Sequence, residues 1–402
     1  MDFETSSADE QFRLQVRSFI QSKLNELFPD RARLGNFLRP PSRETLQAWT
    51  RALDRRGWLV HHWPKAYGGG DWPATWGPIL DDELVAADCP KIDMIGIGFV
   101  GPVIYTFGTA EQKARYLPRI RNADEFWCQG FSEAHGGSDA MSIRTTAVRR
   151  GDKLIINGQK LWTSNAHNAD MMFALVRLDA PVARRQQPGL SFVLLNMHSP
   201  GVTVRPIITI DGRHWVNEVT LDNVEIPASN LVGEQGKGWL YARFLLANER
   251  TIVAGLPIIR RQIAGLKRML VSATRQEAPL FEHTSFRLRV AQVEGELRAL
   301  EFLELRLLHS RRDDAEVHRL APILKLRGTE LRQRISELML EAVGERGLEA
   351  VFDCGQLVGA ADDDIEYAQR ITTAYLFERS ATIAGGTSEI QRNIIAGLSL
   401  GM

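Results

Sequence analysis

The spacing of apolar residues divides the chain into a helical, a β and a second helical region. Toward the N-terminus, four segments carry apolar residues at intervals of three and four, the spacing of an amphipathic helix. These segments are 9–27, 42–56, 81–87 and 111–119. We therefore expect the region 1–124 to be mostly helical.

Near residue 125 the pattern changes to that of strands. Short runs rich in β-branched and aromatic residues are separated by Gly, Pro and Asp, which favour turns. The runs lie at 153–162, 171–178, 190–197, 202–208 and 217–224. They predict a compact antiparallel β unit, a barrel or a sandwich, over 125–232.

The helical spacing returns at Gly238 and continues toward the C-terminus. It is found at 239–273, 285–310, 315–343 and 365–383. Four long amphipathic segments are typical of a helical bundle. A chain of 402 residues is also too long for one ordinary core. The predicted fold class is α+β with three domains: an N-terminal helical domain (1–124), a central antiparallel β domain (125–232) and a C-terminal four-helix bundle (233–402).

Charge and hydropathy exclude several classes of function. Lys plus Arg and Asp plus Glu each number 49, so no excess charge would attract nucleic acid or an anionic membrane. Residues 1–10 are polar and acidic, unlike a signal segment, and no apolar run is long enough to cross a bilayer. We expect no nucleic-acid partner, no membrane insertion and a cytoplasmic location.

Cysteine and histidine give no sign of a metal site. Cys89, Cys128 and Cys354 are odd in number and widely spaced, which favours reduced thiols over a disulfide framework or a zinc site. His61 and His62 have no acidic or histidine partner at helical spacing, so a structural role is favoured over metal ligation.

A glycine-rich loop at 129–139 is the clearest candidate for a binding site. It reads Gln-Gly-Phe-Ser-Glu-Ala-His-Gly-Gly-Ser-Asp. Glycines let a backbone approach a ligand closely, and the hydroxyls of Ser132 and Ser138 are donors that reorient freely. The loop is therefore expected to contact a polar ligand. The alternative is an ordinary surface turn.

The order of residue types in this loop resembles the flavin-loop signature of the acyl-CoA dehydrogenase family. Residues 385–393, Gly-Gly-Thr-Ser-Glu-Ile-Gln-Arg-Asn, resemble the C-terminal signature of that family, and the segments 101–108 and 217–219 are similar to pimeloyl-CoA dehydrogenase large subunits. The resemblance covers nearly the whole chain. It implies an FAD-dependent enzyme that dehydrogenates acyl-CoA to trans-2-enoyl-CoA, with medium, long, dicarboxylic or alicyclic acyl groups, and passes electrons to an electron-transferring flavoprotein.

The reaction needs a carboxylate whose basicity is raised by desolvation, and Glu249 is the candidate. In a helix over 239–273, the residues one turn before and after Glu249 and Arg250 are apolar. An interhelical salt bridge is the alternative for this pair. Some family members carry the base just before the Gly-Thr of the C-terminal signature, where this chain has Gly385. Others, including the isovaleryl-CoA and long-chain dehydrogenases, carry the base on the earlier helix beside an arginine, and Asn-Glu-Arg at 248–250 resembles that arrangement.

The resemblance therefore implies Glu249 as base and Arg250 as a residue of the acyl-CoA site. The N–H of Gly385, together with a flavin ribityl hydroxyl, would polarise the thioester carbonyl. If Glu249 were dispensable, Glu133 or Glu389 would be the next candidates.

The same resemblance implies a set of flavin contacts. Phe131, Ser132 and Gly137 would lie at the flavin, and Ser138 near the CoA or the pyrophosphate. Two further segments contribute: Trp162 and Ser164 would cover and hydrogen-bond the isoalloxazine, and Thr387 would lie near the adenosine. For Trp162, a core aromatic position in a hairpin is the alternative.

The chain departs from the family at the residues that grip the ADP part of a neighbour's FAD. The family uses Arg-x-x-Phe-Gly and Gln-x-x-Gly-Gly-x-Gly, whereas 275–282 lacks the first motif and 341–347 has Glu341 and Glu345 at the Gln and second Gly positions. Carboxylates near a pyrophosphate are unfavourable.

We expect a second, homologous small subunit to supply the missing half. Alternatively, Arg287, Arg289 or Arg346 replaces the lost arginine in a homo-oligomer. A non-catalytic structural subunit is the alternative function, and an oxidase or monooxygenase is a third for which the sequence shows no oxygen-activating site.

Overall fold

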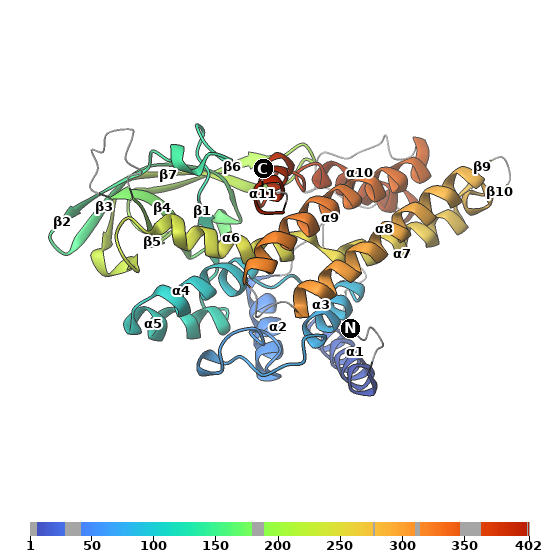
Figure 1. Cartoon of the computed structure of the whole chain (residues 1–402), viewed down its shortest axis with the longest axis horizontal. Coiled ribbons are helices and arrows are strands. Elements are labelled where there is room, and N and C mark those ends of the chain that lie inside the picture. Colours follow the sequence, from blue (N-terminus) through green and yellow to red (C-terminus); the bar gives the residue numbers. More distant parts are fainter. Residues whose placement is uncertain are drawn as a thin grey trace.

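A computed structural model describes residues 6–28, 42–178, 189–275, 278–309, 314–345, 363–399 and 401. Within these ranges, the side chains at 247–252, 274–275, 309, 314–315, 363–369 and 399 lie outside the described part. The N-terminal helices lie along one side of both the sheet and the C-terminal helices (Figure 1). The α+β fold with helical, β and helical regions is confirmed.

The N-terminal region is helical, as the spacing predicts. Its helices are α1 (Ser7–Leu27), α2 (Arg43–Arg55), α3 (Trp76–Ala86), α4 (Gly101–Phe107) and α5 (Ala110–Arg121), with a π-helical turn η3 (Ile95–Val100). Capping boxes begin α1 at Ser6 and α5 at Thr109. The sequence analysis missed η3 and α4 because nearly all of this segment is buried, so its residues show no polar face.

Eight strands of the described residues form one sheet. They are β1 (Trp127–Gly130), β2 (Thr146–Arg150), β3 (Lys153–Ser164), β4 (Met171–Leu178), β5 (Leu190–Asn196), β6 (Val202–Ile208), β7 (His214–Pro227) and β8 (Leu231–Val232). Their order is β6-β7-β3-β2-β4-β5-β8, and β1 also pairs with β4. Most pairs are antiparallel, but β1 and β2 run parallel to β4, a detail that the sequence pattern did not reveal.

Alternate residues of β4 belong to two different cores, as the two-residue period of a strand requires. Met171, Phe173 and Leu175 join the core shared with the N-terminal helices. Met172, Ala174 and Val176 join a second core that lies within the sheet unit. The sheet is therefore held from both faces, and the loops at its edge have a rigid base.

The C-terminal region consists of α6 (Gly238–Ala254), α7 (Leu256–Ser272), α8 (Thr284–His309), α9 (Asp314–Val343), α10 (Asp363–Glu378) and α11 (Ser388–Ser399), with a short hairpin of β9 (Thr274–Arg275) and β10 (Ala278–Pro279). Helix α9 packs against α6, α7, α8, α10 and α11. The prediction of one helix over 239–273 is wrong. Gly255, in the left-handed region at φ 67°, ends α6, and Pro257 lies in the first turn of α7.

Among the described residues, no helix is both long enough and apolar enough to cross a membrane. The same residues contain no group of three His, Cys, Asp or Glu that could hold a metal ion. His61 stacks on Trp72 with ring centroids 4.3 Å apart, a structural contact. Cys89 and Cys128 are buried and form no disulfide within the described residues, and Cys354 lies outside them.

Candidate functional site

The glycine-rich loop is a compact turn tied to strand β3. Glu133 and Gly136 exchange backbone hydrogen bonds, with N···O distances of 2.9 and 3.1 Å. The backbone N–H of Leu161 donates to Ser132 O at 2.9 Å, so the loop lies directly beside Trp162. A Cβ at Gly136 would lie 2.8 Å from the backbone oxygen of Asp139 and 1.8 Å from Ser142 Oγ, so a side chain there would force the turn to shift. Gly137 and Ser138 are exposed at the outer side of the turn.

A buried ion pair anchors the loop from below. Lys160 Nζ donates to Glu133 Oε1 at 2.7 Å and to Leu175 O at 2.8 Å, and the Lys160 side chain is fully buried. Glu133 also accepts bonds from the N–H groups of Arg144 (2.6 Å) and Thr145 (3.0 Å). Burial lowers the pKa of Lys160 to about 8. Burial by itself would raise the pKa of Glu133, but Lys160 and the N–H donors outweigh it, so the net shift is downward.

Glu133 is therefore committed to a structural role, and it is a poor reserve base for the reaction. Its partner Lys160 was not among the predicted site residues. The two-residue period of β3 places Lys160 on the same inward face as Leu154 and Ile156, but it does not show which carboxylate the lysine meets.

We expect Lys160→Met to lower the free energy of unfolding by about 3–5 kcal/mol, because it leaves the buried Glu133 carboxylate without its cation. Chemical denaturation measures this change. The matched control is Lys153→Met, which removes a lysine of the same strand from an exposed pair with Glu225 and should change the free energy of unfolding far less, because water screens an exposed ion pair. Equal losses in the two variants would contradict the anchoring role.

Trp162 is exposed, which rules out the core aromatic position. The pairing register of β3 and β7 shifts between Lys160 and Thr163, and Trp162 takes a left-handed φ of 60°. Its side chain is 56% exposed. Ser164 is exposed two residues later, whereas Thr163 points inward, and its buried Oγ1 has no hydrogen-bond partner in the described part of the chain. An indole turned outward by a strained residue is an available platform for a planar ligand.

Phe131 is only partly available to a ligand. Its ring packs edge-on against Phe173 at a centroid distance of 5.6 Å and lies 6.2 Å from the ring of Phe192. The backbone of Phe131 still begins the glycine-rich loop, next to Ser132.

The C-terminal signature forms a tight double-glycine turn before α11. Gly385 and Gly386 have φ of 67° and 87°, and both carbonyls accept bonds from Gln391 Nε2, at 3.3 and 3.1 Å. The buried Lys325 donates to Gly386 O at 2.8 Å. Thr387 Oγ1 accepts a bond from Ile390 N at 3.3 Å and so caps the first turn of α11.

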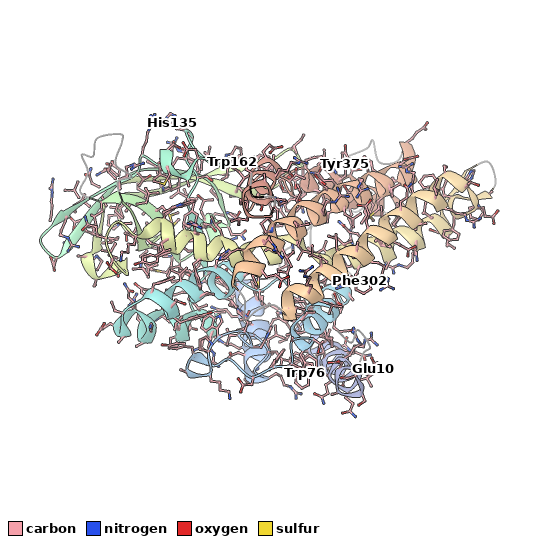
Figure 2. All side chains as sticks on the ribbon, viewed as in Figure 1. Glu10, Trp76, His135, Trp162, Phe302 and Tyr375 are labelled. Carbon is pink, nitrogen blue, oxygen red and sulfur yellow. The ribbon has the colours of Figure 1, made fainter. Side chains whose placement is uncertain are left out.

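A cluster of aromatic and charged side chains packs between the sheet and the C-terminal helices. The ring centroids of Trp215 on β7 and Phe377 on α10 lie 5.6 Å apart. The Arg213 guanidinium lies 4.7 Å from the first ring and 5.6 Å from the second. Buried Asp211 binds both Arg213 and the indole N–H of Trp215. Figure 2 shows Trp162 on the sheet and Tyr375 on α10, on the two sides of this junction.

Helix α6 carries Glu249 and Arg250, whose side chains lie outside the described residues. The helix begins in one core and ends in another: Tyr241 and Leu245 belong to the core shared with the N-terminal helices, and Ala254 to that of the C-terminal bundle. It packs against β5, η3, α4 and α9. The backbone of Glu249 therefore lies on a helix enclosed by all three regions.

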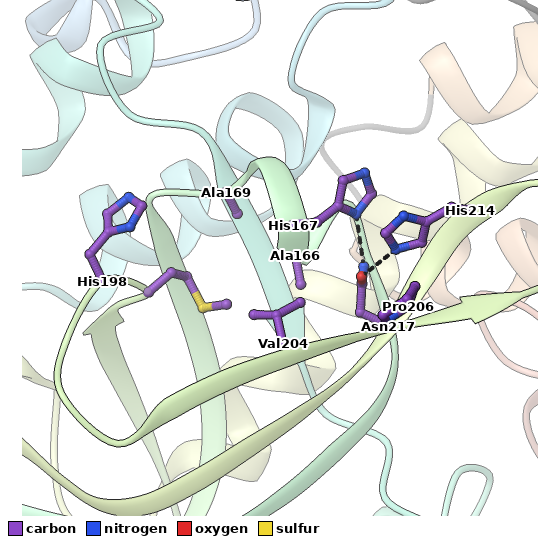
Figure 3. A pocket seen from close by; sticks show the side chains of 9 residues that line it. Ala166, His167, Ala169, His198, Val204, Pro206, His214 and Asn217 are labelled. Atoms are coloured by element: carbon purple, nitrogen blue, oxygen red, sulfur yellow. Dashed lines mark hydrogen bonds between the residues drawn. The ribbon is translucent and has the colours of Figure 1, made fainter. Parts of the chain in front are cut away.

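A pocket of about 340 Å³ lies between residues 166–169, which follow β3, and the strands β6 and β7 (Figure 3). The rings of His167 and His214 stack with centroids 3.9 Å apart, and Asn217 hydrogen-bonds both. Asn217 Nδ2 also donates to Thr163 O at 3.0 Å. Burial lowers the pKa of His167. The sequence analysis did not identify this cluster, whose visible effect is to support the strand that turns Trp162 outward.

At the predicted ADP half-site, Glu341 forms an ion pair with Arg289, with 2.6 Å between Oε2 and Nη2. Arg289 is therefore engaged by a carboxylate of the chain itself. Glu345 is exposed. The Arg275 side chain, residues 276–277 and residues 346–347 lie outside the described part, as does one of the proposed substitutes, Arg346.

Models of three domains of one family match successive parts of the chain. They are the N-terminal domain of acyl-CoA dehydrogenase at residues 6–124, the middle domain at 128–224 and the C-terminal domain at 236–399. Acyl-CoA dehydrogenase IpdE1 of Mycobacterium tuberculosis (strain ATCC 25618 / H37Rv) is 33% identical over 401 residues, which cover 98% of this chain and 97% of the relative. IpdE1 of Mycolicibacterium smegmatis is 31% identical over 411 residues, with 98% and 97% covered.

Solved structures of similar fold include two complexes. The Tcur3481-Tcur3483 steroid ACAD matches with a TM-score of 0.84 and 27% identity, over 100% of this chain and 99% of that one. The ChsE4-ChsE5 complex from Mycobacterium tuberculosis matches with a TM-score of 0.82 and 28% identity, again over 100% and 99%.

Proposed function

The chain belongs to the acyl-CoA dehydrogenase family, and from this premise we propose that Glu249 is its catalytic base and that a second, homologous subunit completes its FAD site. Members of the family are FAD flavoproteins, and the chain is an oxidoreductase that dehydrogenates an acyl-CoA. When bound, FAD accepts the hydride that leaves the β carbon. The observation that carries the proposal is the position of Glu249 on the enclosed helix α6.

The residues present fit a flavin. Trp162 offers an exposed indole, and Ser164 is exposed two residues later on the same strand. The backbone bond from Leu161 N to Ser132 O holds the glycine-rich loop, with Ser132 and the exposed Gly137, beside this strand. An exposed aromatic ring with hydroxyl groups close to it suits a planar, hydrogen-bonding ring system. Thr387, at the start of α11, would hold the adenosine side.

Glu249 would take the proton from the α carbon of the thioester. Desolvation raises the pKa of a carboxylate and makes it a stronger base near neutral pH, and the proposal requires this of Glu249. Arg250, the next residue of α6, would contact the acyl-CoA, and Ser138 would hold its CoA part.

Gly385 would support the same step with its backbone. Because the carbonyls of Gly385 and Gly386 bind Gln391 and Lys325, the turn directs its oxygens toward the protein. The N–H of Gly385 would then donate to the thioester oxygen, which gains negative charge as the proton leaves. A left-handed φ at this position suits glycine.

The second subunit would supply the grip on the ADP part of FAD. The ion pair of Glu341 and Arg289 supports this, because it places a carboxylate where the family has Gln and occupies an arginine that could have replaced the missing one. The similar structures ChsE4-ChsE5 and Tcur3481-Tcur3483 are complexes of two named proteins. A non-catalytic role beside an active partner is the alternative.

The reduced flavin would pass its electrons to an electron-transferring flavoprotein. The acyl group would be medium, long, dicarboxylic or alicyclic.

Anaerobic flavin bleaching tests the proposal. The flavin-loaded complex should lose its yellow absorbance when an acyl-CoA is added and should recover it with an electron-transferring flavoprotein. Rapid recovery with oxygen alone would indicate an oxidase instead. If a base variant of the partner abolished bleaching while Glu249→Gln left bleaching unchanged, the chemistry would belong to the partner.

A further inference from the structure

Three side chains where α7, α9 and α10 meet hold polar atoms without partners. Glu378 Oε1 accepts bonds from Arg332 Nη2 at 2.9 Å and from Gln262 Nε2 at 3.2 Å. The second atoms of the same groups, Glu378 Oε2, Arg332 Nε and Gln262 Oε1, are buried, and among the described residues they have no hydrogen-bond partner. We call these three residues the Glu378 cluster.

Such orphan atoms need an explanation, because a buried polar atom without a partner destabilises the fold. Glu378 and Arg332 are 5% and 8% exposed, so bulk solvent does not serve them. Each orphan atom is two covalent bonds from an atom of the hydrogen-bonded set, so all three lie at the same junction of α7, α9 and α10.

This region lies beside the proposed base. Arg332 Nη1 donates to the carbonyl of Val253 at 3.2 Å. Val253 follows Glu249 by four residues on α6, which is about 6 Å along the helix axis. A Cβ at Gly255 would lie 3.2 Å from Arg332 Nη1, so the end of α6 is fitted closely to this arginine.

One face of α9 links the cluster to the double-glycine turn. Lys325, which holds Gly386 O, and Arg332 are seven residues apart and therefore lie on one face. Their separation along α9 is about 10 Å. A thioester with its oxygen at Gly385 and its acyl group directed along α9 would have the far part of that group at the Glu378 cluster.

We propose that the Glu378 cluster is a subsite that recognises a hydroxyl group on the acyl chain or ring, about 10 Å from the thioester. This inference rests on the proposed function. A hydroxyl accepts one bond and donates another. It would accept from Arg332 Nε–H and donate to Glu378 Oε2 or Gln262 Oε1. An unsubstituted hydrocarbon would leave the orphans unpaired, and a carboxylate would place a second negative charge against Glu378.

The test compares two CoA esters that differ only in this distal hydroxyl, on the flavin-loaded complex. We expect kcat/KM to be on the order of 10²-fold or more higher for the hydroxylated ester, because sites that hydrogen-bond a substrate hydroxyl reject the analogue lacking it. Gln262→Leu should reduce this ratio about tenfold through the lost acceptor. The control Gln292→Leu, at an exposed glutamine on α8, should leave the ratio unchanged.

Calorimetry measures the affinity of the complex for each ester and so tests the same preference without turnover. Glu378→Gln, whose side chain has nearly the same size as the original, serves as a second variant beside Gln262→Leu. A ratio near one, with both esters bleaching the flavin, would overturn the subsite and assign the orphans to buried water. Preference for a dicarboxylic ester would overturn the choice of a hydroxyl. Absence of bleaching with every ester would instead overturn the proposed function, and this inference with it.

Discussion

Glu249→Gln should lower the rate of flavin reduction by the acyl-CoA about 10²–10⁴-fold, the usual loss for a general base. The amide is nearly isosteric with the carboxylate but does not take up the α proton. The fold and the flavin content should stay unchanged. Stopped-flow bleaching of the flavin under anaerobic conditions measures the rate, and the flavin spectrum serves as the control for binding.

Glu249→Asp separates chemistry from folding in this experiment. It keeps the carboxylate and withdraws it by one methylene, so it should retain part of the rate that Glu249→Gln loses. If Glu249→Gln reduced the flavin at the full rate, the base would lie elsewhere. Of the two other candidates, Glu389 would then remain, because Glu133 is held by Lys160 and two backbone N–H groups. Glu389 is 76% exposed and therefore lacks the desolvation that the reaction needs.

The chain purified without a partner should contain far less than one FAD per chain and show essentially no turnover. The reason is electrostatic: the ADP end would face Glu341 and Glu345, and the family's arginine motif is absent. Mixing with a homologous small subunit should restore both flavin and activity. Flavin absorbance per chain after gel filtration measures the first, and acyl-CoA turnover the second.

The opposite result has a defined meaning. If the lone chain bound one FAD and turned over acyl-CoA, the heteromeric site would be wrong, and a homo-oligomer with a substitute arginine would take its place. Arg287→Ala and Arg289→Ala would then identify the substitute. Because Arg289 already pairs with Glu341, we expect it to be the weaker candidate.

Much of the fold could be predicted from apolar spacing because N-terminal helices such as α1, and strands such as β3 and β7, bury one face and expose the other. Strands β4 and β5 are buried on both faces and were instead indicated by continuous apolar runs. The exceptions have physical causes. Gly255 splits a helix whose apolar pattern runs on unchanged across the break, so only the glycine and the following Pro257 signalled it. The segment 95–107 is buried on nearly all sides and therefore lacks the periodicity that identifies a helix.

Some parts of the candidate site could be predicted from the sequence and others could not. The glycine-rich turns and Trp162 could be predicted as site residues because the residues around them resemble motifs of the acyl-CoA dehydrogenase family. The Lys160–Glu133 pair and the Glu378 cluster could not, since each joins residues distant in sequence: 27 positions separate the first pair, and 116 separate Gln262 from Glu378. Such contacts depend on tertiary packing, which local pattern does not encode.

Exchange of the α proton tests the role of Glu249 most directly. The flavin-loaded complex is incubated in D₂O with an acyl-CoA, and mass spectrometry follows deuterium at the α carbon. The wild-type complex should introduce deuterium there, Glu249→Asp should do so more slowly, and Glu249→Gln should not do so above the rate in buffer. Wild-type exchange by the Glu249→Gln complex would contradict the assignment of the base to helix α6.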